Sequence, residues 1–275
     1  MVLSDEIQNP LIDHTLAKIA IFAYLATETI EAGVMCACRF QPLLSSFRGL
    51  RDLFFPRRCV VCGRLLAGDE EDLCPDCFAG LPLTYQWDLV QNAAFERLAQ
   101  RFDVEAAAAL LFFGSESDYR KILYAIKYGG RQQLGYRMGF VLGEQLAGSP
   151  AFRGCQAVVP VPLHPLRRWK RGYNQAEVIG RGVAAATKVP LETKLLHRNR
   201  YTQTQTRLHG EAKTKNVDGA FRLDPERAAR LRHDGVRDLL LIDDVLTTGS
   251  TLSACAAPLQ AAGFRIYCAT LAFAG

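Results

Sequence analysis

The segment at residues 239–251, LLLIDDVLTTGST, constrains the fold of this chain more than any other part of its sequence. Four apolar residues, short enough for a buried parallel strand, run into Asp243 and Asp244; a turn rich in Thr, Gly and Ser follows, and then apolar residues return at helical spacing. This pattern predicts a strand, a loop and the start of a helix. Backbone N–H groups at a helix N-terminus favour a phosphate, and acids at a strand end can accept hydrogen bonds from vicinal hydroxyls. The spacing suits a ribose phosphate, which Gly249 would allow the backbone to approach.

The chain beyond about residue 103 alternates between short apolar runs and helical patterns. With 275 residues, 49% apolar and 22% charged, it lies in the globular range, which excludes disordered, collagen-like and coiled-coil proteins. The alternation predicts an α/β fold, a mostly parallel sheet with flanking helices on both faces. The expected strands are 106–113, 157–161, 239–242 and 265–273, and the expected helices include 118–127 and 175–187. Pro258 should kink the helix that follows the phosphate turn, or end it early.

Cysteine spacing points to a metal site. Four of the nine cysteines form two C-x2-C pairs with eleven residues between them: Cys59, Cys62, Cys74 and Cys77. Two such pairs can present four thiolates to one tetrahedral ion, which predicts a structural Zn2+ site. The alternative is four buried thiols whose spacing is coincidental. The other cysteines are expected to be mostly small buried hydrophobes.

Charge is unevenly distributed along the chain, whose net charge is +5. Residues 151–200 hold ten Lys or Arg and two Glu, whereas residues 69–76 hold five acids and no base. The basic stretch implies an anionic ligand such as a phosphate, a pyrophosphate or a nucleic acid. The longest early apolar run, residues 19–27, is half of what a bilayer crossing needs, and the first ten residues lack the basic start of a signal peptide. We therefore expect no transmembrane segment and a cytoplasmic location.

Three segments resemble known proteins. Residues 239–251 resemble, at all thirteen positions, the phosphoribosyl pyrophosphate (PRPP) signature of type I phosphoribosyltransferases. VVPVPLHPLRRWKRGYNQAE (158–177) resembles the PVP and RGYNQ motifs of the ComF family, and ILYAIKYGG (122–130) resembles its lysine-bearing helix. A cysteine module ahead of the transferase domain is also characteristic of ComF proteins. Apolar residues at helical spacing predict a helical extension (1–48). The resemblance, which covers about residues 50–275, implies a zinc-binding module with a hood or linker (49–103) and a phosphoribosyltransferase-like domain (104–275).

The resemblance also implies roles for individual residues. Asp243 and Asp244 would be the catalytic pair that holds the ribose hydroxyls, with Mg2+ bridging pyrophosphate and ribose. The 5-phosphate would be bound by Thr247, Thr248, Gly249, Ser250 and Thr251. The residues that would bind the pyrophosphate or belong to the flexible loop are Lys127, Arg171, Arg200 and Lys213. Loss of pyrophosphate leaves positive charge on the sugar and negative charge on the leaving group, which gives cations and a metal here an independent physical rationale.

Two features of the basic segments bear on partners. Arg198 and Arg200 stand at the spacing of the family's flexible loop, where Lys213 replaces the usual arginine and so loses the bidentate fork. Arg167 and Arg168 are expected to project outward, whereas Arg171 is expected to border the phosphates. Some tyrosines interleave with these cations in a pattern that could stack single-stranded bases, with core packing as the alternative: Tyr128, Tyr173 and Tyr201.

Three functions are compatible with this sequence. The first is a PRPP-binding ComF-like protein in natural competence, acting in DNA uptake with single-stranded DNA and competence proteins as partners. The second is an active phosphoribosyltransferase of nucleotide metabolism with an unidentified nucleobase or amine acceptor. The third is a zinc-stabilised nucleic-acid binder with a vestigial transferase fold, which the intact acidic pair and phosphate turn disfavour. The sequence does not decide between the first two, because fold-level analogy does not identify a reaction.

Overall fold

The computed structural model describes residues 56–114, 116–198 and 219–275. The chain divides into two compact units, residues 1–80 and residues 81–275. The helical extension expected at residues 1–48 lies outside the described residues. Within the described parts of the chain, no helix is both long and apolar enough to cross a membrane.

The described part of the first unit consists of loops and one short helix, α3 (Pro75–Ala79). Gly63, directly after the first cysteine pair, has a φ of +77°, a conformation that glycine adopts without strain. Its N–H donates to the carbonyl oxygen of Cys59 at 2.9 Å and closes the turn. The buried apolar residues of this part are few: Cys59, Val61, Leu73, Cys74 and Cys77. So small a core predicts that these loops need a further cross-link, such as a disulfide or a metal ion, for their stability.

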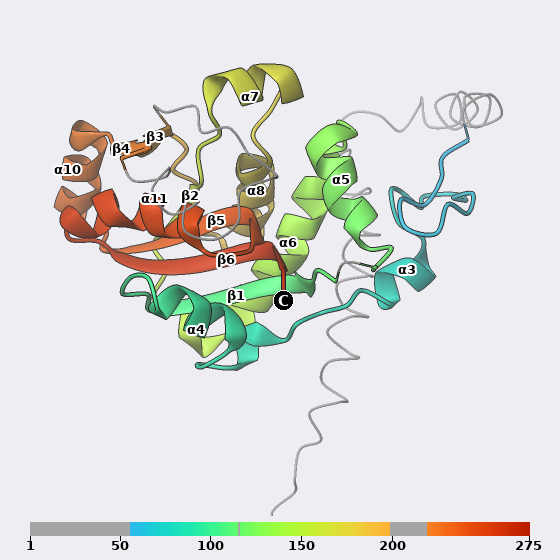
Figure 1. The fold of residues 1–275 in the computed structure, drawn as a ribbon, viewed down its shortest axis with the longest axis horizontal. Helices are drawn as coiled ribbons and strands as arrows, with labels where there is room; N and C mark the ends of the chain where they lie inside the picture. Colours follow the sequence, from blue (N-terminus) through green and yellow to red (C-terminus); the bar gives the residue numbers. More distant parts are fainter. Residues whose placement is uncertain (1–55, 115, 199–218) are drawn as a thin grey trace, which may run out of the picture. The chain divides into compact units, whose positions relative to one another are not determined.

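The second unit is built on a four-stranded parallel sheet with the strand order β1-β6-β5-β2 (Figure 1). Its strands are β1 (Ala106–Phe112), β2 (Ala157–Pro160), β5 (Asp238–Leu246) and β6 (Arg265–Phe273). The central strands β5 and β6 pair from Asp238↔Arg265 to Leu246↔Phe273. Runs such as AAAALLF in β1 supply the nearly continuous apolar surface that a strand covered on both faces requires. The predicted α/β class is confirmed.

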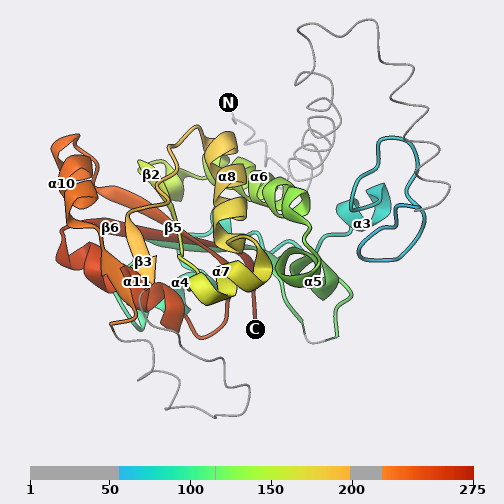
Figure 2. The same cartoon turned by 90° about the horizontal axis from the view of Figure 1, so that it is seen from above.

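Helices cover both faces of the sheet (Figure 2). One face carries α6 (Gln132–Gly148) and α8 (Gln175–Thr187), and the other carries α4 (Ala93–Ala99) and α11 (Ser250–Ala261). On the second face, helix and strand side chains form one core that includes Leu98, Leu252, Leu259, Ala107, Val159 and Leu241. This core fixes α4 and the start of α11 against the same sheet.

The helices α6 and α8 pack backbone against backbone. A Cβ atom added to Gly139 would overlap the carbonyl oxygen of Ile179, and one added to Gly182 would overlap that of Tyr136. Because the obstacles are backbone atoms, no side-chain rotation could relieve either overlap. Glycine is therefore required on both sides of this contact.

The remaining elements surround the sheet. They are two short 3₁₀ turns, η1 (Gln86–Asp88) and η2 (Pro150–Phe152), three helices, α5 (Arg120–Tyr128), α7 (Pro165–Arg171) and α10 (Pro225–His233), and the antiparallel strands β3 (Leu196–Arg198) and β4 (Phe221–Leu223). Helix α7 contains no buried residue, although it follows directly on β2. Its sequence, PLRRWKR, therefore faces solvent over most of its surface.

The expected end of one strand was wrong. The strand expected to end at residue 242 continues to Leu246, because β6 pairs with it as far as Phe273. Asp243 and Asp244 consequently lie within β5 rather than at its end. Of the two outcomes expected at Pro258, early termination does not occur, since the helix continues to Ala261. The proline occupies the last turn, where it removes only one intrahelical hydrogen bond.

Candidate functional site

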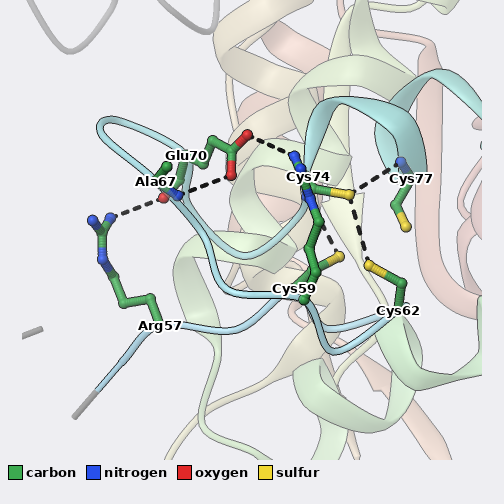
Figure 3. A network of polar contacts seen from close by, with 8 residues as sticks. Arg57, Cys59, Cys62, Ala67, Glu70, Cys74 and Cys77 are labelled. Atoms are coloured by element: carbon green, nitrogen blue, oxygen red, sulfur yellow. Dashed lines mark hydrogen bonds and ion pairs between the residues drawn. The ribbon is translucent and has the colours of Figure 1, made fainter. Parts of the chain in front are cut away.

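The four predicted zinc ligands lie together in the first unit (Figure 3). The Sγ atoms of Cys59, Cys62, Cys74 and Cys77 all lie within 4.8 Å of one another, and those of Cys62 and Cys74 are 3.8 Å apart. Sulfurs at about 2.3 Å from zinc in a tetrahedron are separated by about 3.8 Å. Among the described residues this is the one group of metal-ligating side chains. The four sulfurs therefore fit a structural zinc ion with no position left for a substrate.

Backbone N–H groups point at these sulfurs. The N–H of Cys74 donates to Cys59 Sγ at 3.4 Å, and the N–H of Cys77 donates to Cys74 Sγ at 3.4 Å. Burial by itself raises the pKa of Cys59, but hydrogen bonds from the backbone of Cys62, Cys74 and Val61 outweigh it and lower that pKa to about 6. For Cys77, burial is the main cause of a raised pKa. A thiolate is thus favoured at Cys59 by the fold of the loops themselves.

Polar contacts hold the loop between the two cysteine pairs (Figure 3). The guanidinium of Arg57 donates to the carbonyl oxygen of Glu70 at 2.8 Å and to that of Gly68 at 2.9 Å. The carboxylate of Glu70 accepts the N–H of Ala67 at 3.0 Å and forms an ion pair with Arg64 at 2.8 Å. These contacts fold the loop back on itself, so that the second cysteine pair lies beside the first.

The two predicted ribose-binding acids lie in the carboxyl-terminal half of β5, in the second unit. Strand β2 ends at Pro160, opposite Ile242, so that beyond this point β5 pairs with β6 alone. Both acids are half-buried, and Asp243 Oδ1 accepts the N–H of Asp244 at 2.8 Å. Asp244 Oδ2 lies 3.2 Å from Nζ of Lys127, near the end of α5. The fold thus brings a predicted pyrophosphate-binding lysine directly to the acidic pair.

Asp243 has an unusual protonation equilibrium. Burial, and then the negative charge of Asp244, raise the pKa of Asp243 to about 7, while Lys127 and Arg198 act in the opposite direction. Arg198 ends β3, and its guanidinium lies 5.1 Å from the ring centroid of Phe221. Burial lowers the pKa of Arg198, and the charge of Asp243 opposes that shift. Arg198 is therefore a cation of this site that its place in the loop motif alone did not reveal.

The turn after β5 has the geometry of an anion-binding helix start. Gly249 is the N-cap of α11, with a φ of +77°, and among the described residues no side chain caps the first turn of this helix. Thr247 and Thr248 are exposed, and Thr248 Oγ1 lies 2.9 Å from Ser250 Oγ. Thr251 continues the first turn. Uncapped N–H groups beside exposed hydroxyls at the start of a twelve-residue helix favour a phosphate.

Helix α4 supports this turn from behind, through contacts that local sequence does not indicate. A Cβ atom on Gly249 would lie 2.7 Å from Leu98 Cδ2 and 3.3 Å from Arg101 Cδ, so the glycine makes room for α4 and the residues that follow it. The guanidinium of Arg97 donates to the carbonyl oxygen of Thr247 at 2.7 Å and also to that of Ala274. These pairs are separated by 150 and 177 positions, which no motif or periodicity links.

The other predicted cations are placed differently. Arg171, the last residue of α7, donates to Gln175 Oε1 at 2.9 Å and to the hydroxyl of Tyr128 at 3.4 Å. The hydroxyl of buried Tyr173 donates to the carbonyl oxygen of Ile126, so that this tyrosine packs in the core. Cys255 and Cys268 are buried, and Cys155 is half-buried. Residues that lie outside the described part are Cys36, Cys38, Arg200, Tyr201 and Lys213.

Comparisons with known proteins agree with this arrangement. Residues 50–87 match the family model of the double zinc ribbon domain. A curated protein named "DNA utilization protein YhgH", from Escherichia coli O157:H7, is 27% identical over 221 residues, which are 76% of this chain and 88% of that protein. "Competence protein F" from Haemophilus influenzae is 36% identical over 98 residues, 36% of this chain and 41% of that one.

Among solved structures, a chain described as "structure of the allosteric regulatory enzyme of purine biosynthesis" matches with a TM-score of 0.33 and 19% identity. The match covers 53% of this chain and 29% of the other. The assignment rests instead on the curated relatives, the zinc ribbon and the sequence motifs. Together they confirm the resemblance to ComF proteins: a double zinc ribbon precedes an α/β domain whose motifs resemble those of phosphoribosyltransferases.

Proposed function

We propose that this chain binds PRPP together with Mg2+ at the carboxyl end of β5, and that it does so in the handling of DNA during natural competence. The observation that carries the proposal is the sequence of features along one strand and one helix. The acids Asp243 and Asp244 lie in the part of β5 that pairs with β6 alone, and the N-cap of α11, Gly249, follows five residues after Asp244. Hydroxyl-binding and phosphate-binding groups thereby follow one another along the chain, as the two ends of a ribose phosphate would require.

Each side chain has a defined task in this proposal. Asp243 and Asp244 accept hydrogen bonds from the ribose hydroxyls, while N–H and hydroxyl groups of residues 247–251 donate to the 5-phosphate. Lys127, now paired with Asp244 at 3.2 Å, exchanges that carboxylate for the pyrophosphate. Carboxylate oxygens beside phosphates are also the donors that Mg2+ prefers, so the residues present fit this ion. When bound, Mg2+ neutralises charge on the pyrophosphate.

The proposed process comes from the relatives. One is named for DNA utilization and another for competence, which supports a role of this chain in the uptake or use of DNA. PRPP is a cytoplasmic metabolite, and the proposed function accordingly places the protein in the cytoplasm, with competence proteins as its partners. The zinc ribbon and the PRPP site lie in separate compact units, as a metal-stabilised accessory module would.

A second candidate is an active phosphoribosyltransferase with a nucleobase or amine acceptor. This candidate is favoured by the combination of acids and cations. Lys127 and Arg198 both lower the pKa of Asp243 through their positive charge. Their charges would therefore act where charge develops during loss of pyrophosphate. In this case PRPP would be consumed rather than only bound.

Calorimetric titration of the full chain with PRPP and Mg2+ tests the proposal, followed by an assay of pyrophosphate release with nucleobases and amines. We expect saturable binding at one site. Binding without release in the presence of every acceptor favours the ligand-binding role, and acceptor-dependent release favours the transferase. Absence of binding with and without Mg2+ contradicts both.

We expect the affinity for PRPP to rise about tenfold between pH 6 and pH 8, because a protonated Asp243 must lose its proton before it accepts a hydrogen bond. Burial and the charge of Asp244 raise the pKa of Asp243 to about 7. Stability has the opposite dependence: the folded pKa lies above the unfolded one, so the free energy of unfolding falls as pH rises from about 4 to about 7. Calorimetry at both pH values and 13C NMR of the carboxyl measure this. A carboxyl that titrates near pH 4 contradicts it, and Asp243→Asn should remove the stability dependence.

A further inference from the structure

Two exposed tyrosines, flanked by two half-buried arginines, form a continuous ladder of side chains across α5 and α7. The Arg120 guanidinium lies 5.8 Å from the Tyr124 ring centroid and donates to its hydroxyl at 3.2 Å. The rings of Tyr124 and Tyr128 are 6.1 Å apart and inclined by 32°. The Arg171 guanidinium, from α7, lies 5.0 Å from the Tyr128 ring. We call these four residues the tyrosine ladder.

The rings of the ladder face solvent rather than the core. Tyr124 is 50% exposed and Tyr128 69% exposed, in a helix whose apolar side is buried through Ile122, Leu123 and Ile126. Trp169, on α7, is 83% exposed. Three large aromatic side chains on α5 and α7 thus leave half or more of their surface exposed within the described part of this unit. Their exposure suits a ligand with flat apolar faces.

The same two helices are strongly basic. Helices α5 and α7 together contain seven Lys or Arg and no Asp or Glu: Arg120, Lys121, Lys127, Arg167, Arg168, Lys170 and Arg171. Ion pairs join Lys121 to Asp118, Lys127 to Asp244 and Arg168 to Glu177. The two helices themselves contribute positive charge alone to the surface around the rings. The contact between Arg171 and Tyr128 joins the carboxyl-terminal ends of the two helices, which are neighbours in Figure 2.

We propose that the tyrosine ladder is a stacking surface for single-stranded DNA. Successive bases would stack on Tyr124 and Tyr128, and the arginines at the two ends and along α7 would neutralise the phosphates. Stacking on aromatic side chains combined with a basic track is how proteins bind single strands without reading their sequence. In a duplex the bases are stacked on one another, so no base face is available to stack on the tyrosine rings.

This proposal adds a partner to the proposed function and rests on it for the choice of DNA, but its site is separate. PRPP requires the acids of β5 and the turn at residues 247–251, whereas the ladder presents no acceptor for hydroxyls. Lys127 precedes Tyr128 and pairs with Asp244 at 3.2 Å, so the ladder ends beside the ribose-binding acids. A strand lying on Tyr128 would thus pass the entrance of the PRPP site.

The test compares binding of a fluorescein-labelled 20-nucleotide oligothymidylate with that of an abasic strand of the same length. We expect Tyr124→Leu with Tyr128→Leu to weaken binding of oligothymidylate about 10- to 100-fold, as expected from the loss of one or two stacked bases. Binding of the abasic strand and the salt dependence should not change, because no charge is removed. The matched control is Phe112→Leu, an exposed aromatic at the end of β1, which should bind like the wild type.

A second variant tests the electrostatic part. Arg167→Ala with Arg168→Ala should reduce the slope of log affinity against log salt by up to about 1.4, since each neutralised phosphate contributes about 0.7 for single strands. The proposal is overturned if the tyrosine variant binds oligothymidylate like the wild type, or if it loses the abasic strand equally. Exclusive binding of oligouridylate, or preference for a duplex, would overturn the assignment to single-stranded DNA.

The outcome is independent of the PRPP titration. Tyrosine-dependent DNA binding by a protein that gives no heat with PRPP supports the ladder and contradicts the proposed function. Saturable PRPP binding without tyrosine-dependent DNA binding does the reverse. Thermal unfolding of each variant confirms that the fold is intact, which the exposure of both rings leads us to expect.

Discussion

Replacing Cys74 with serine is expected to release zinc and unfold the loops at residues 56–80. The four sulfurs are the only metal-ligating group among the described residues, and the apolar core around them is small. Binding of structural zinc supplies about 10–16 kcal/mol in isolated zinc-finger peptides, far more than such a core could. We expect purified wild-type protein to contain about one zinc per chain at this site, and Cys74→Ser to lose it.

Zinc analysis combined with hydrogen exchange measures this effect. Amides at residues 56–80 should lose protection, while those of the β5–β6 core keep theirs, because the two units are compact separately. Cys155→Ser is the matched control, since Cys155 is a half-buried cysteine of the second unit outside the cluster. A metal-free Cys74→Ser protein with unchanged exchange would show that zinc does not stabilise these loops.

The second large effect is expected from Asp243→Asn combined with Asp244→Asn, which should weaken PRPP binding at least about 100-fold. A hydrogen bond to a charged acceptor contributes about 1.5–3 kcal/mol, and two of them together exceed the 2.8 kcal/mol that corresponds to 100-fold. The fold should survive, because β5 keeps its pairing with β6. At pH 8 the change at Asp243 removes a charge that burial disfavours, as its pKa of about 7 indicates.

Calorimetry with PRPP and Mg2+, together with thermal unfolding at pH 8, separates binding from stability. Asp234→Asn, which removes one exposed acid beyond the end of α10, is the control for the same substitution elsewhere and should bind PRPP normally. Unchanged affinity in the double variant would show that the ribose lies elsewhere. Binding lost together with the folded state would leave the role of the acids as hydroxyl acceptors unsupported.

The parts of the molecule that sequence predicted well depend on short spacing. The zinc ligands lie within one stretch of nineteen residues, and the C-x2-C spacing alone brings the two thiols of each pair close together. The strands of the sheet were likewise visible as apolar runs. The end of β5 was wrong because it depends on pairing with β6, and periodicity within β5 contains no information on where its partner ends.

The surroundings of the proposed PRPP site were predicted less completely. Arg97 and Leu98 support the phosphate turn from a helix about 150 positions earlier, and nothing in their local pattern marks them for this role. Arg198 belonged to a recognised loop motif, but its electrostatic effect on Asp243 depends on how β3 folds back on the sheet. Contacts between distant segments are decided by packing, which a single sequence does not specify.

The glycine contact between α6 and α8 determines where this domain can bend. Because the two backbones touch at Gly139 and Gly182, the helices must move as one rigid body. Asn174, just before α8, is tied to the same body by its hydrogen bond to the carbonyl oxygen of Val161 at 3.0 Å. Gly172, with a φ of +79°, separates this body from α7, which has no buried residue. A rotation of α7 against this body would therefore turn about Gly172, and it would break the hydrogen bond from Arg171 to Gln175 of α8.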